Sequence, residues 1–329
     1  MRAMNARAVR IREAGGPEVL ELGKITVRPP GPHEVRIAVR AAGLNRADCL
    51  QRRGIYPAPK GTVADVPGLE YAGEVEACGE AVTDLEPGQR VMGIVAGGSM
   101  ATLLVAHERE CVPMPKNMSF EDAAAIPEAF FTAYDALVLQ GAMAGGDHVL
   151  IHAAGSGVGT AAIQIARALG GRTIGTSRTA GKLTRCTELG LDHGLHTPDG
   201  TFAKQIREFG GADLILDTIG AKYLNENLAS LRTGGRIVVI GLLGGIKGEL
   251  DLGKLLSKRA TLHGSVLRSR PLEEKITLAQ LFTRRLLPLF ERGALRPVVD
   301  TVMDMEEIQA AHTRMESGQT FGKLVLRWS

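Results

Sequence analysis

The chain has 329 residues, of which 44% are hydrophobic and 23% charged, and its formal net charge at pH 7 is +3. This composition is typical of folded globular proteins and argues against intrinsic disorder. The basic residues are scattered along the chain, whereas nucleic-acid-binding proteins usually concentrate them on one face. The length predicts about two domains.

No apolar run approaches the roughly 18 residues that a membrane-spanning helix needs, and the first residues lack the apolar core of a signal peptide. The four cysteines, Cys49, Cys78, Cys111 and Cys186, are far apart and form no Cys-x-x-Cys pair. This spacing predicts neither a disulfide framework nor a local zinc motif. We therefore expect a cytoplasmic protein that does not contact membranes.

Short β-like runs broken by glycine and proline fill the first third of the chain, at residues 34–39, 73–77, 90–94 and 101–105. They predict a β-rich domain. Near Ser119, a plausible helix N-cap, the pattern becomes helical and then alternates between strand and helix.

Six strand-like segments follow, at residues 148–152, 173–177, 194–196, 213–217, 236–241 and 262–267. Helical segments separate most of them, so we predict a doubly wound parallel sheet of strand order 3-2-1-4-5-6. The segment from residue 268 holds helices and a closing strand at 322–326, too little for a third core. The predicted organisation is α/β: a β-rich domain at 1–127, a Rossmann domain at 128–267, and a return to the first domain at 268–329.

A buried strand, a tight turn and an amphipathic helix follow one another over residues 148–169. The turn consists of Gly155, Ser156, Gly157, Val158 and Gly159. Small residues let a pyrophosphate approach the chain, and the first N–H groups of the helix receive the anion. Ala154 and Ser156 replace the first two glycines of the Gly-x-Gly-x-x-Gly frame, so the strand-turn-helix context carries the prediction of a dinucleotide site.

The second strand of this region ends at Ser177 and Arg178. Sites for NAD usually have an Asp or Glu at this place, about 20 residues after the glycines, to bind the ribose hydroxyls. Here a hydroxyl and a cation replace the acid, and Lys182 lies one helical turn beyond. The pattern favours NADPH, whose 2′-phosphate suits these groups. The alternative is that Arg178 and Lys182 are solvated surface residues.

Five motifs occur in order along the chain: Ala-Ala-Gly-Leu-Asn-Arg-Ala-Asp at 41–48, Pro-Gly-Leu-Glu-Tyr-Ala-Gly at 67–73, Ala-Ala-Ala-Ile-Pro-Glu at 123–128, the turn at 153–159, and Phe-Gly-Lys-Leu-Val-Leu at 321–326. Together they resemble the medium-chain dehydrogenase/reductase superfamily, and within it the zinc-free, zeta-crystallin-like NADPH:quinone oxidoreductases. The resemblance implies a GroES-like β-rich catalytic domain beside the Rossmann domain.

Two positions depart from the zinc-dependent members of that superfamily. Asn45 stands where they carry a cysteine ligand, and Leu69 stands where they carry a histidine ligand. Leucine cannot bind zinc, and no Cys or His cluster nearby replaces it. We therefore expect no catalytic metal and an acceptor that is already reactive toward hydride, such as a quinone or an activated enone.

The resemblance also implies roles for single residues. Asn45 and Tyr56 would line the substrate cleft, where the Tyr56 phenol either donates a hydrogen bond to a developing oxyanion or only packs against the substrate. Residues expected to contact the cofactor are Thr132, near the nicotinamide amide, Gly241, Leu242, Ser265 and Leu267, along its wall, and Lys323, at the cleft edge. Asp48 is expected to support the structure, Glu128 to cap a helix, and His148 and His152 to be structural.

The sequence thus predicts NADPH-dependent reduction of quinones without a metal. Reduction of 2-enoyl thioesters or enones is a second hypothesis, because the same fold supports it. A third is an NADPH-loaded binding protein that contacts RNA. We also expect a homodimer formed through the edge strand at 262–267, because an uncovered sheet edge is a natural pairing site.

Overall fold

The computed structural model describes residues 2–329, which divide into two compact units. The terminal unit combines the chain up to Phe131 with Leu267–Ser329, and the central unit is Thr132–Val266. The boundaries expected from the sequence, after residues 127 and 267, differ from these by four residues and by one. Residues 128–131 join the terminal unit because Phe130 and Phe131 pack against Phe290 and Phe282, with ring centroids 4.8 and 4.5 Å apart.

The terminal unit contains a seven-stranded sheet of order β14-β15-β3-β4-β5-β7, with β6 paired to β3, and a separate β1-β2 hairpin. Its strands are β1 (Met4–Ile11), β2 (Leu20–Val27), β3 (Glu34–Leu44), β4 (Glu70–Cys78), β5 (Arg90–Ile94), β6 (Leu103–His107), β7 (Val112–Pro113), β14 (Val299–Asp304) and β15 (Lys323–Arg327). Alternate residues of β3, including Val35, Ile37 and Val39, point into a core shared with β4 and β5. The β-rich character expected of this region is confirmed.

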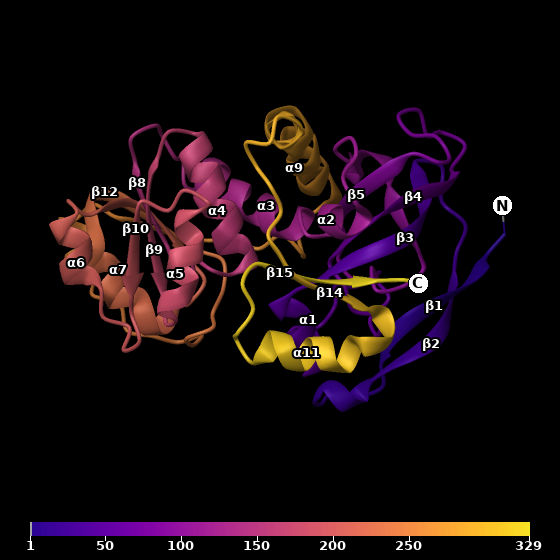
Figure 1. Cartoon of the computed structure of the whole chain (residues 1–329), viewed down its shortest axis with the longest axis horizontal. Helices are drawn as coiled ribbons and strands as arrows, with labels where there is room; N and C mark the ends of the chain where they lie inside the picture. Colours follow the sequence, from indigo (N-terminus) through magenta and orange to yellow (C-terminus); the bar gives the residue numbers. More distant parts are fainter. Residues whose placement is uncertain (1) are drawn as a thin grey trace. The chain divides into compact units, whose positions relative to one another are not determined.

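Strand β15, yellow in Figure 1, pairs antiparallel with the far end of β3, where Leu324 lies opposite Leu44. This pairing extends β3 to residue 44, beyond the 34–39 run that alternation alone indicated. Segments 280 or more residues apart in sequence therefore share one sheet.

Six helices complete the terminal unit or join it to the central unit. They are α1 (Arg46–Arg52), α2 (Phe120–Ala124), α3 (Pro127–Tyr134), α9 (Leu272–Arg285), α10 (Leu287–Glu291) and α11 (Ile308–Glu316). Helix α1 was not predicted from the sequence. It begins with a capping box formed by Asn45 and Asp48. The fully buried Arg52 ties α1 to α11 by donating to Glu316 Oε1 at 2.8 Å and contacting His312 Nδ1 at 3.1 Å.

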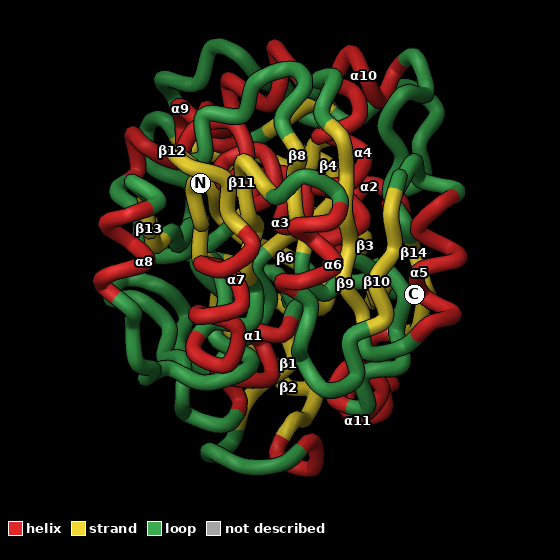
Figure 2. The backbone as a smooth tube through the Cα atoms, turned by 90° about the vertical axis from the view of Figure 1, so that its left-hand side faces the viewer, coloured by secondary structure: helices red, strands yellow, loops and turns green. Residues whose placement is uncertain are grey.

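The central unit is a six-stranded parallel sheet of order β10-β9-β8-β11-β12-β13. Its strands are β8 (His148–Ile151), β9 (Arg172–Ser177), β10 (His193–His196), β11 (Ala212–Asp217), β12 (Leu231–Val239) and β13 (Thr261–Gly264). Numbered within this unit, the order is 3-2-1-4-5-6, so the predicted doubly wound topology is confirmed. Figure 2 shows β13, in yellow, at the margin of the sheet.

Helices lie on both faces of this sheet, with α4 and α5 on one side and α6 and α7 on the other (Figure 1). Their bounds are α4 (Gly157–Ala168), α5 (Ala180–Thr187), α6 (Ala203–Glu208), α7 (Leu224–Ser230) and α8 (Leu252–Ser257). Two strands differ from expectation by more than one residue: β12 spans Leu231–Val239 rather than 236–241, and β13 spans Thr261–Gly264 rather than 262–267. Leu267 consequently belongs to the terminal unit. Within residues 2–329 no helix is long and apolar enough to cross a bilayer.

Candidate active site

The turn between β8 and α4 has the geometry of an anion site. Ser156 caps α4, and its Oγ accepts from the N–H of Gly159 at 3.0 Å. A Cβ on Gly159 would lie only 2.5 Å from the Ala153 carbonyl oxygen, so only glycine fits where the helix meets the strand end. The N–H groups of Gly157 and Val158 precede the helical hydrogen-bond ladder and are directed at the space before the helix, where the dipole favours negative charge.

A buried polar network holds this turn in place. His152, which follows β8 and is fully buried, contacts Thr176 Oγ1 through Nδ1 at 2.8 Å and Asn227 Oδ1 through Nε2 at 2.6 Å. Asn227 Nδ2 donates to Asp217 Oδ2 at 3.0 Å, which connects the ends of β8, β9 and β11. Burial lowers the pKa of His152, so the ring is neutral. We name this group the histidine network: His152, Thr176, Asp217 and Asn227.

The histidine network also fixes two neighbouring turns. Ala153, directly after the histidine, has a φ of +49°, a left-handed conformation that costs an alanine energy and persists only when its surroundings enforce it. The other oxygen of Asp217 accepts from the backbone N–H groups of Ile219, at 2.7 Å, and Gly220, at 3.0 Å. The structural role expected of His152 is therefore to connect the carboxyl ends of three strands.

The residues predicted to select NADPH lie directly after β9. The Ser177 hydroxyl bonds both the carbonyl and the N–H of Thr179 at 3.0 Å, so it closes a local turn. Arg178 is exposed, and Lys182 is partly exposed on α5. Between Thr176 and Lys182 the chain has no carboxylate, so the groups of this segment that face solvent are cationic.

Other residues predicted to contact the cofactor follow the neighbouring strands. Gly241 comes after β12, where a Cβ would lie 2.9 Å from the Thr218 carbonyl oxygen, and Leu242 next to it is 51% exposed. Ser265 follows β13 and donates to Asp135 at 2.7 Å. The central unit therefore gathers the turn at 155–159, Ser177, Arg178, Gly241, Leu242 and Ser265 at the carboxyl ends of its strands, where ligands bind in doubly wound sheets. Thr132 is partly exposed on α3.

The terminal unit holds a second cluster, built around Glu70. This fully buried carboxylate, the first residue of β4, ion-pairs with Lys323 Nζ at 2.5 Å and accepts from Asn45 Nδ2 at 2.8 Å. Lys323 Nζ also donates to Asn45 Oδ1 at 2.5 Å and to the Leu44 carbonyl at 3.2 Å. All three protons of the ammonium group thus have acceptors within the terminal unit, so Lys323 organises Asn45 and Glu70. We name Asn45, Glu70 and Lys323 the lysine cluster.

Asp48 holds the backbone on either side of the lysine cluster in place. Its carboxylate accepts from the backbone N–H of Asn45 at 2.8 Å and from that of Gly68 at 2.9 Å. Burial raises the pKa of Asp48 to about 6. The residue therefore clamps the start of α1 to the segment that leads into Glu70, which agrees with the supporting role expected from the sequence.

Arg268 holds the loop that carries Tyr56. Its guanidinium donates to the Ala96 carbonyl at 2.7 Å, to the Tyr56 carbonyl at 3.2 Å and to Gln51 Oε1 at 2.5 Å. It also lies 5.1 Å from the centre of the Tyr56 ring. The Tyr56 side chain remains partly exposed, and burial raises the pKa of its phenol, so at neutral pH the hydroxyl keeps its proton.

The sequence did not identify Glu70 as a site residue. The signal for Glu70 is its place in the otherwise apolar run 66–72, since a buried carboxylate needs a partner. No local signal predicts the hydrogen bonds of Arg268, because its acceptors lie as far away as residue 51.

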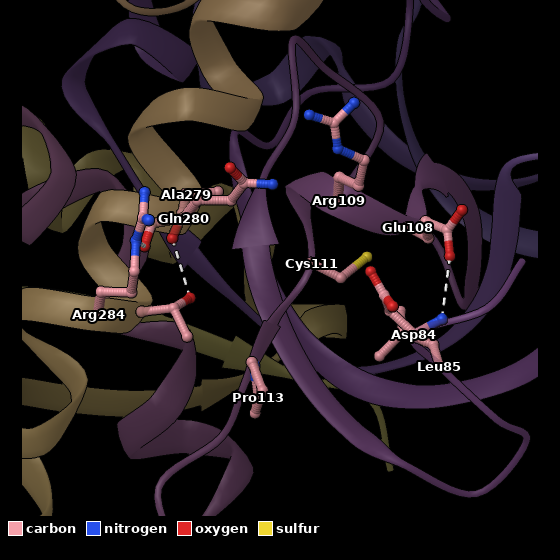
Figure 3. A pocket seen from close by; sticks show the side chains of 10 residues that line it. Asp84, Leu85, Glu108, Arg109, Cys111, Pro113, Ala279, Gln280 and Arg284 are labelled. Atoms are coloured by element: carbon pink, nitrogen blue, oxygen red, sulfur yellow. Dashed lines mark hydrogen bonds between the residues drawn. The ribbon is translucent and has the colours of Figure 1, made fainter.

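A cavity of about 410 Å³ lies elsewhere on the terminal unit, between α9 and the loops around residues 84 and 110 (Figure 3). Its lining includes Glu108, Arg109, Cys111 and Arg284. Burial raises the pKa of the Cys111 thiol to about 12, so this thiol is unreactive. None of the residues predicted for the active site lines this cavity.

Comparison with known proteins identifies the family of the chain. The family described as Alcohol dehydrogenase GroES-like domain matches residues 31–116, and that described as Zinc-binding dehydrogenase matches residues 157–284. A quinone oxidoreductase of Lama guanicoe is 34% identical over 97% of each chain. The chain belongs to the medium-chain dehydrogenase/reductase superfamily. It is therefore an oxidoreductase that uses a nicotinamide cofactor. The family resemblance inferred from its motifs is confirmed.

The chain is also similar to proteins with other described activities. It is 36% identical, over 96% of its length, to a part of the spectinabilin polyketide synthase system protein NorB of Streptomyces orinoci, and it spans 14% of that protein. Among solved structures, an NAD-dependent alcohol dehydrogenase is 34% identical with a TM-score of 0.88, covering 98% of this chain and 100% of the other. The CurK enoyl reductase is 27% identical with a TM-score of 0.87, covering 98% and 99%.

The residues of this superfamily member fit a dinucleotide but not a catalytic zinc. The glycine-only contact at Gly159 and the N-terminus of α4 match what a pyrophosphate requires. In contrast, Asn45 is bonded to an ammonium group and Leu69 is an apolar side chain that is 2% exposed. Among residues 2–329, no group of three or more His, Cys, Asp or Glu side chains is arranged to hold a metal ion.

Proposed function

We propose that this protein reduces quinones with NADPH and without a metal. The observation that carries the proposal is the lysine cluster. There the Lys323 ammonium group is bonded to the Glu70 carboxylate and the Asn45 amide, whose oxygens could otherwise bind a metal cation. With no Lewis acid to activate an alcohol or a carbonyl, the acceptor itself has to be electrophilic. Quinones meet this requirement, and the similarity to quinone oxidoreductases supports the choice.

The bound nicotinamide would supply the hydride. The residues of the chain would bind and orient both reactants, which is where most of the catalysis of hydride transfer can come from. In the terminal unit, Asn45 is held rigidly by Glu70 and Lys323, and the Tyr56 hydroxyl is available to donate a hydrogen bond to the oxygen that gains charge. Thr132, Gly241, Leu242, Ser265 and Leu267 are proposed to line the nicotinamide half of the cofactor.

The choice of NADPH depends on Arg178 and Lys182. Both are cationic groups that follow the end of β9, where a ribose-binding acid would be expected in an NAD site. Because the Ser177 hydroxyl is used in its own turn, we assign the 2′-phosphate contact to the two cations and a positioning role to Ser177.

Enone or enoyl-thioester reduction is a second candidate function, favoured by the similarity to the CurK enoyl reductase. The two functions are separated by following NADPH oxidation against ortho- and para-quinones, enones and acyl thioesters, with NADH alongside. Quinone turnover at least tenfold above that of the other acceptors would support the first proposal. Turnover confined to enones or thioesters would overturn it.

We further propose a homodimer in a reducing compartment, in keeping with four cysteines that are all free thiols. The surface near the edge of the central sheet supports the dimer, since all four residues of β13 are exposed and Leu252 and Leu256 of α8 are 67% and 80% exposed. Light scattering on the wild type and on Leu256→Asp tests this: a monomeric wild type would disprove the dimer, whereas a dimer that Leu256→Asp dissociates would support it.

A further inference from the structure

Among the ionisable groups around the lysine cluster, one acid has no partner within residues 2–329. Glu128, near the start of α3, feels the charges of groups on several other segments of the terminal unit: Asp48 on α1, Glu70 on β4, Lys323 on β15 and Arg268. The Glu128 charge also acts on the Tyr56 phenol. Glu128 therefore lies beside the lysine cluster and near Tyr56, which is proposed to contact the substrate.

The hydrogen bonds of the neighbouring charged groups are already in use. Lys323 donates to three acceptors, Arg268 donates to three, and Asp48 accepts from two backbone N–H groups. Glu70 accepts through both of its oxygens. The carboxyl of Glu128 is different, because it has no hydrogen bond or ion pair to any residue of 2–329.

The backbone of Glu128 is nevertheless held firmly. Its N–H donates to Glu70 Oε2 at 2.8 Å, and Pro127 precedes it at the first position of the helix. Its side chain is partly exposed. A carboxyl on a fixed backbone, without a structural partner and within reach of solvent, is suited to exchange a proton.

We propose that Glu128 is the proton donor of the reduction, which deepens the proposed function and rests on it. The acceptor would gain a hydride, supplied by the nicotinamide, and a proton from the Glu128 carboxyl. The O–H bond of the carboxyl breaks while an O–H bond of the hydroquinone forms. The resulting carboxylate regains its proton from water before the next turnover, so the enzyme returns to its starting state.

The protonation state of Glu128 agrees with this role. Burial, together with the charge of Glu70, raises the pKa of Glu128 to about 8 from an ordinary 4.5, against the opposing effects of Lys323 and Arg268. The group is thus protonated at neutral pH and loses its proton as the pH rises through about 8. An acid with this pKa is well matched to donate at physiological pH.

The first test uses the protein without cofactor. Infrared difference spectra of the wild type and Glu128→Gln should contain the carbonyl stretch of one protonated carboxyl at pH 7, which disappears with a midpoint near pH 8. The matched control is Glu121→Gln, which makes the same change on α2. A Glu128 that is already ionised at pH 7 would overturn the inference.

The second test uses turnover of a quinone. Glu128→Gln should lower kcat about 100-fold with little change in KM and should remove the fall in kcat above pH 8, whereas Glu128→Asp should retain part of the rate. An unchanged kcat and pH profile in Glu128→Gln would overturn the inference but leave the proposed function intact. No quinone turnover by the wild type would instead refute the proposed function, while the infrared titration would still report on Glu128.

Discussion

The two units each contain a buried polar cluster whose members are all paired, but only the cluster of the terminal unit adjoins an acid without a partner among residues 2–329. In the central unit, both ring nitrogens of His152 have partners, as do both oxygens of Asp217. In the terminal unit, the lysine cluster is equally well paired but adjoins the unpaired carboxyl of Glu128. A fully paired network of this kind fixes geometry. An adjoining unpaired acid adds a proton that is available for chemistry.

The largest expected effect comes from breaking the ion pair of the lysine cluster. Lys323→Met leaves the fully buried Glu70 carboxylate without its counter-charge, which should cost about 3–5 kcal/mol of unfolding free energy. Urea denaturation at pH 7 measures this loss. Adding Glu70→Gln to Lys323→Met should recover much of the stability, and a double variant as unstable as the single one would show that the ion pair is not the cause.

A smaller effect is expected from opening the histidine network. His152→Phe keeps a ring that can pack against Phe202 and Tyr223 but removes the partner of Asn227 Oδ1 and of Thr176 Oγ1. It should reduce the unfolding free energy by about 1–3 kcal/mol and should leave the pH profile of kcat unchanged. A shifted pH profile would mean that the histidine takes part in proton transfer, contrary to the comparison above.

A substitution in the turn at residues 155–159, which the histidine network supports, should weaken binding of the cofactor. Gly159→Ala places a methyl group against the carbonyl oxygens of Ala153 and Ala154 and should raise the Kd for NADPH about tenfold, equivalent to about 1.4 kcal/mol. Titration calorimetry measures the change. Gly181→Ala on α5, where a Cβ would meet nothing within 4 Å, is the matched control and should bind normally.

The smallest effect is expected from removing the exposed cation Arg178. Arg178→Ala should weaken NADPH binding about fivefold, in line with about 1 kcal/mol for an exposed charge pair, and this difference should shrink at high salt. NADH serves as the internal control because it lacks the 2′-phosphate. Equal weakening of both cofactors would contradict the assignment of Arg178 to that phosphate.

The pH dependence of stability separates Glu128 from its paired neighbours. Because the folded-state pKa of Glu128 is raised, the stability it contributes is complete below about pH 4.5 and falls as the pH rises through 8. The melting temperature of Glu128→Gln should therefore fall less than that of the wild type between pH 6 and 9. Parallel curves for the two proteins would show that the carboxyl is not perturbed.

Sequence reasoning was most successful where the signal is local. The alternation of strands and helices between residues 148 and 264 predicted the parallel sheet and its strand order, since each crossover has a preferred hand. Strand ends were less certain, as at β12 and β13, because the apolar pattern continues past the last ladder hydrogen bond.

The sites depended on contacts that no window of sequence contains. Lys323 and Asn45 are 278 residues apart, and Arg268 and Gln51 are 217 apart. Their pairing follows from the strand register of β15 on β3 and from the fold as a whole. The motif resemblance identified Asn45 and Lys323 as site residues, but it did not reveal that they bind each other and Glu70.

The position of β15 has a consequence for biosynthesis. A ribosome completes Glu70 and Asn45 long before it reaches Lys323, and the whole central unit emerges in between. The buried carboxylate consequently has no counter-charge until the codon for Lys323 has been translated, whereas the parallel sheet can form earlier as a unit. Limited proteolysis of stalled nascent chains should find residues 132–266 protected while the segment carrying Glu70 is still cleaved.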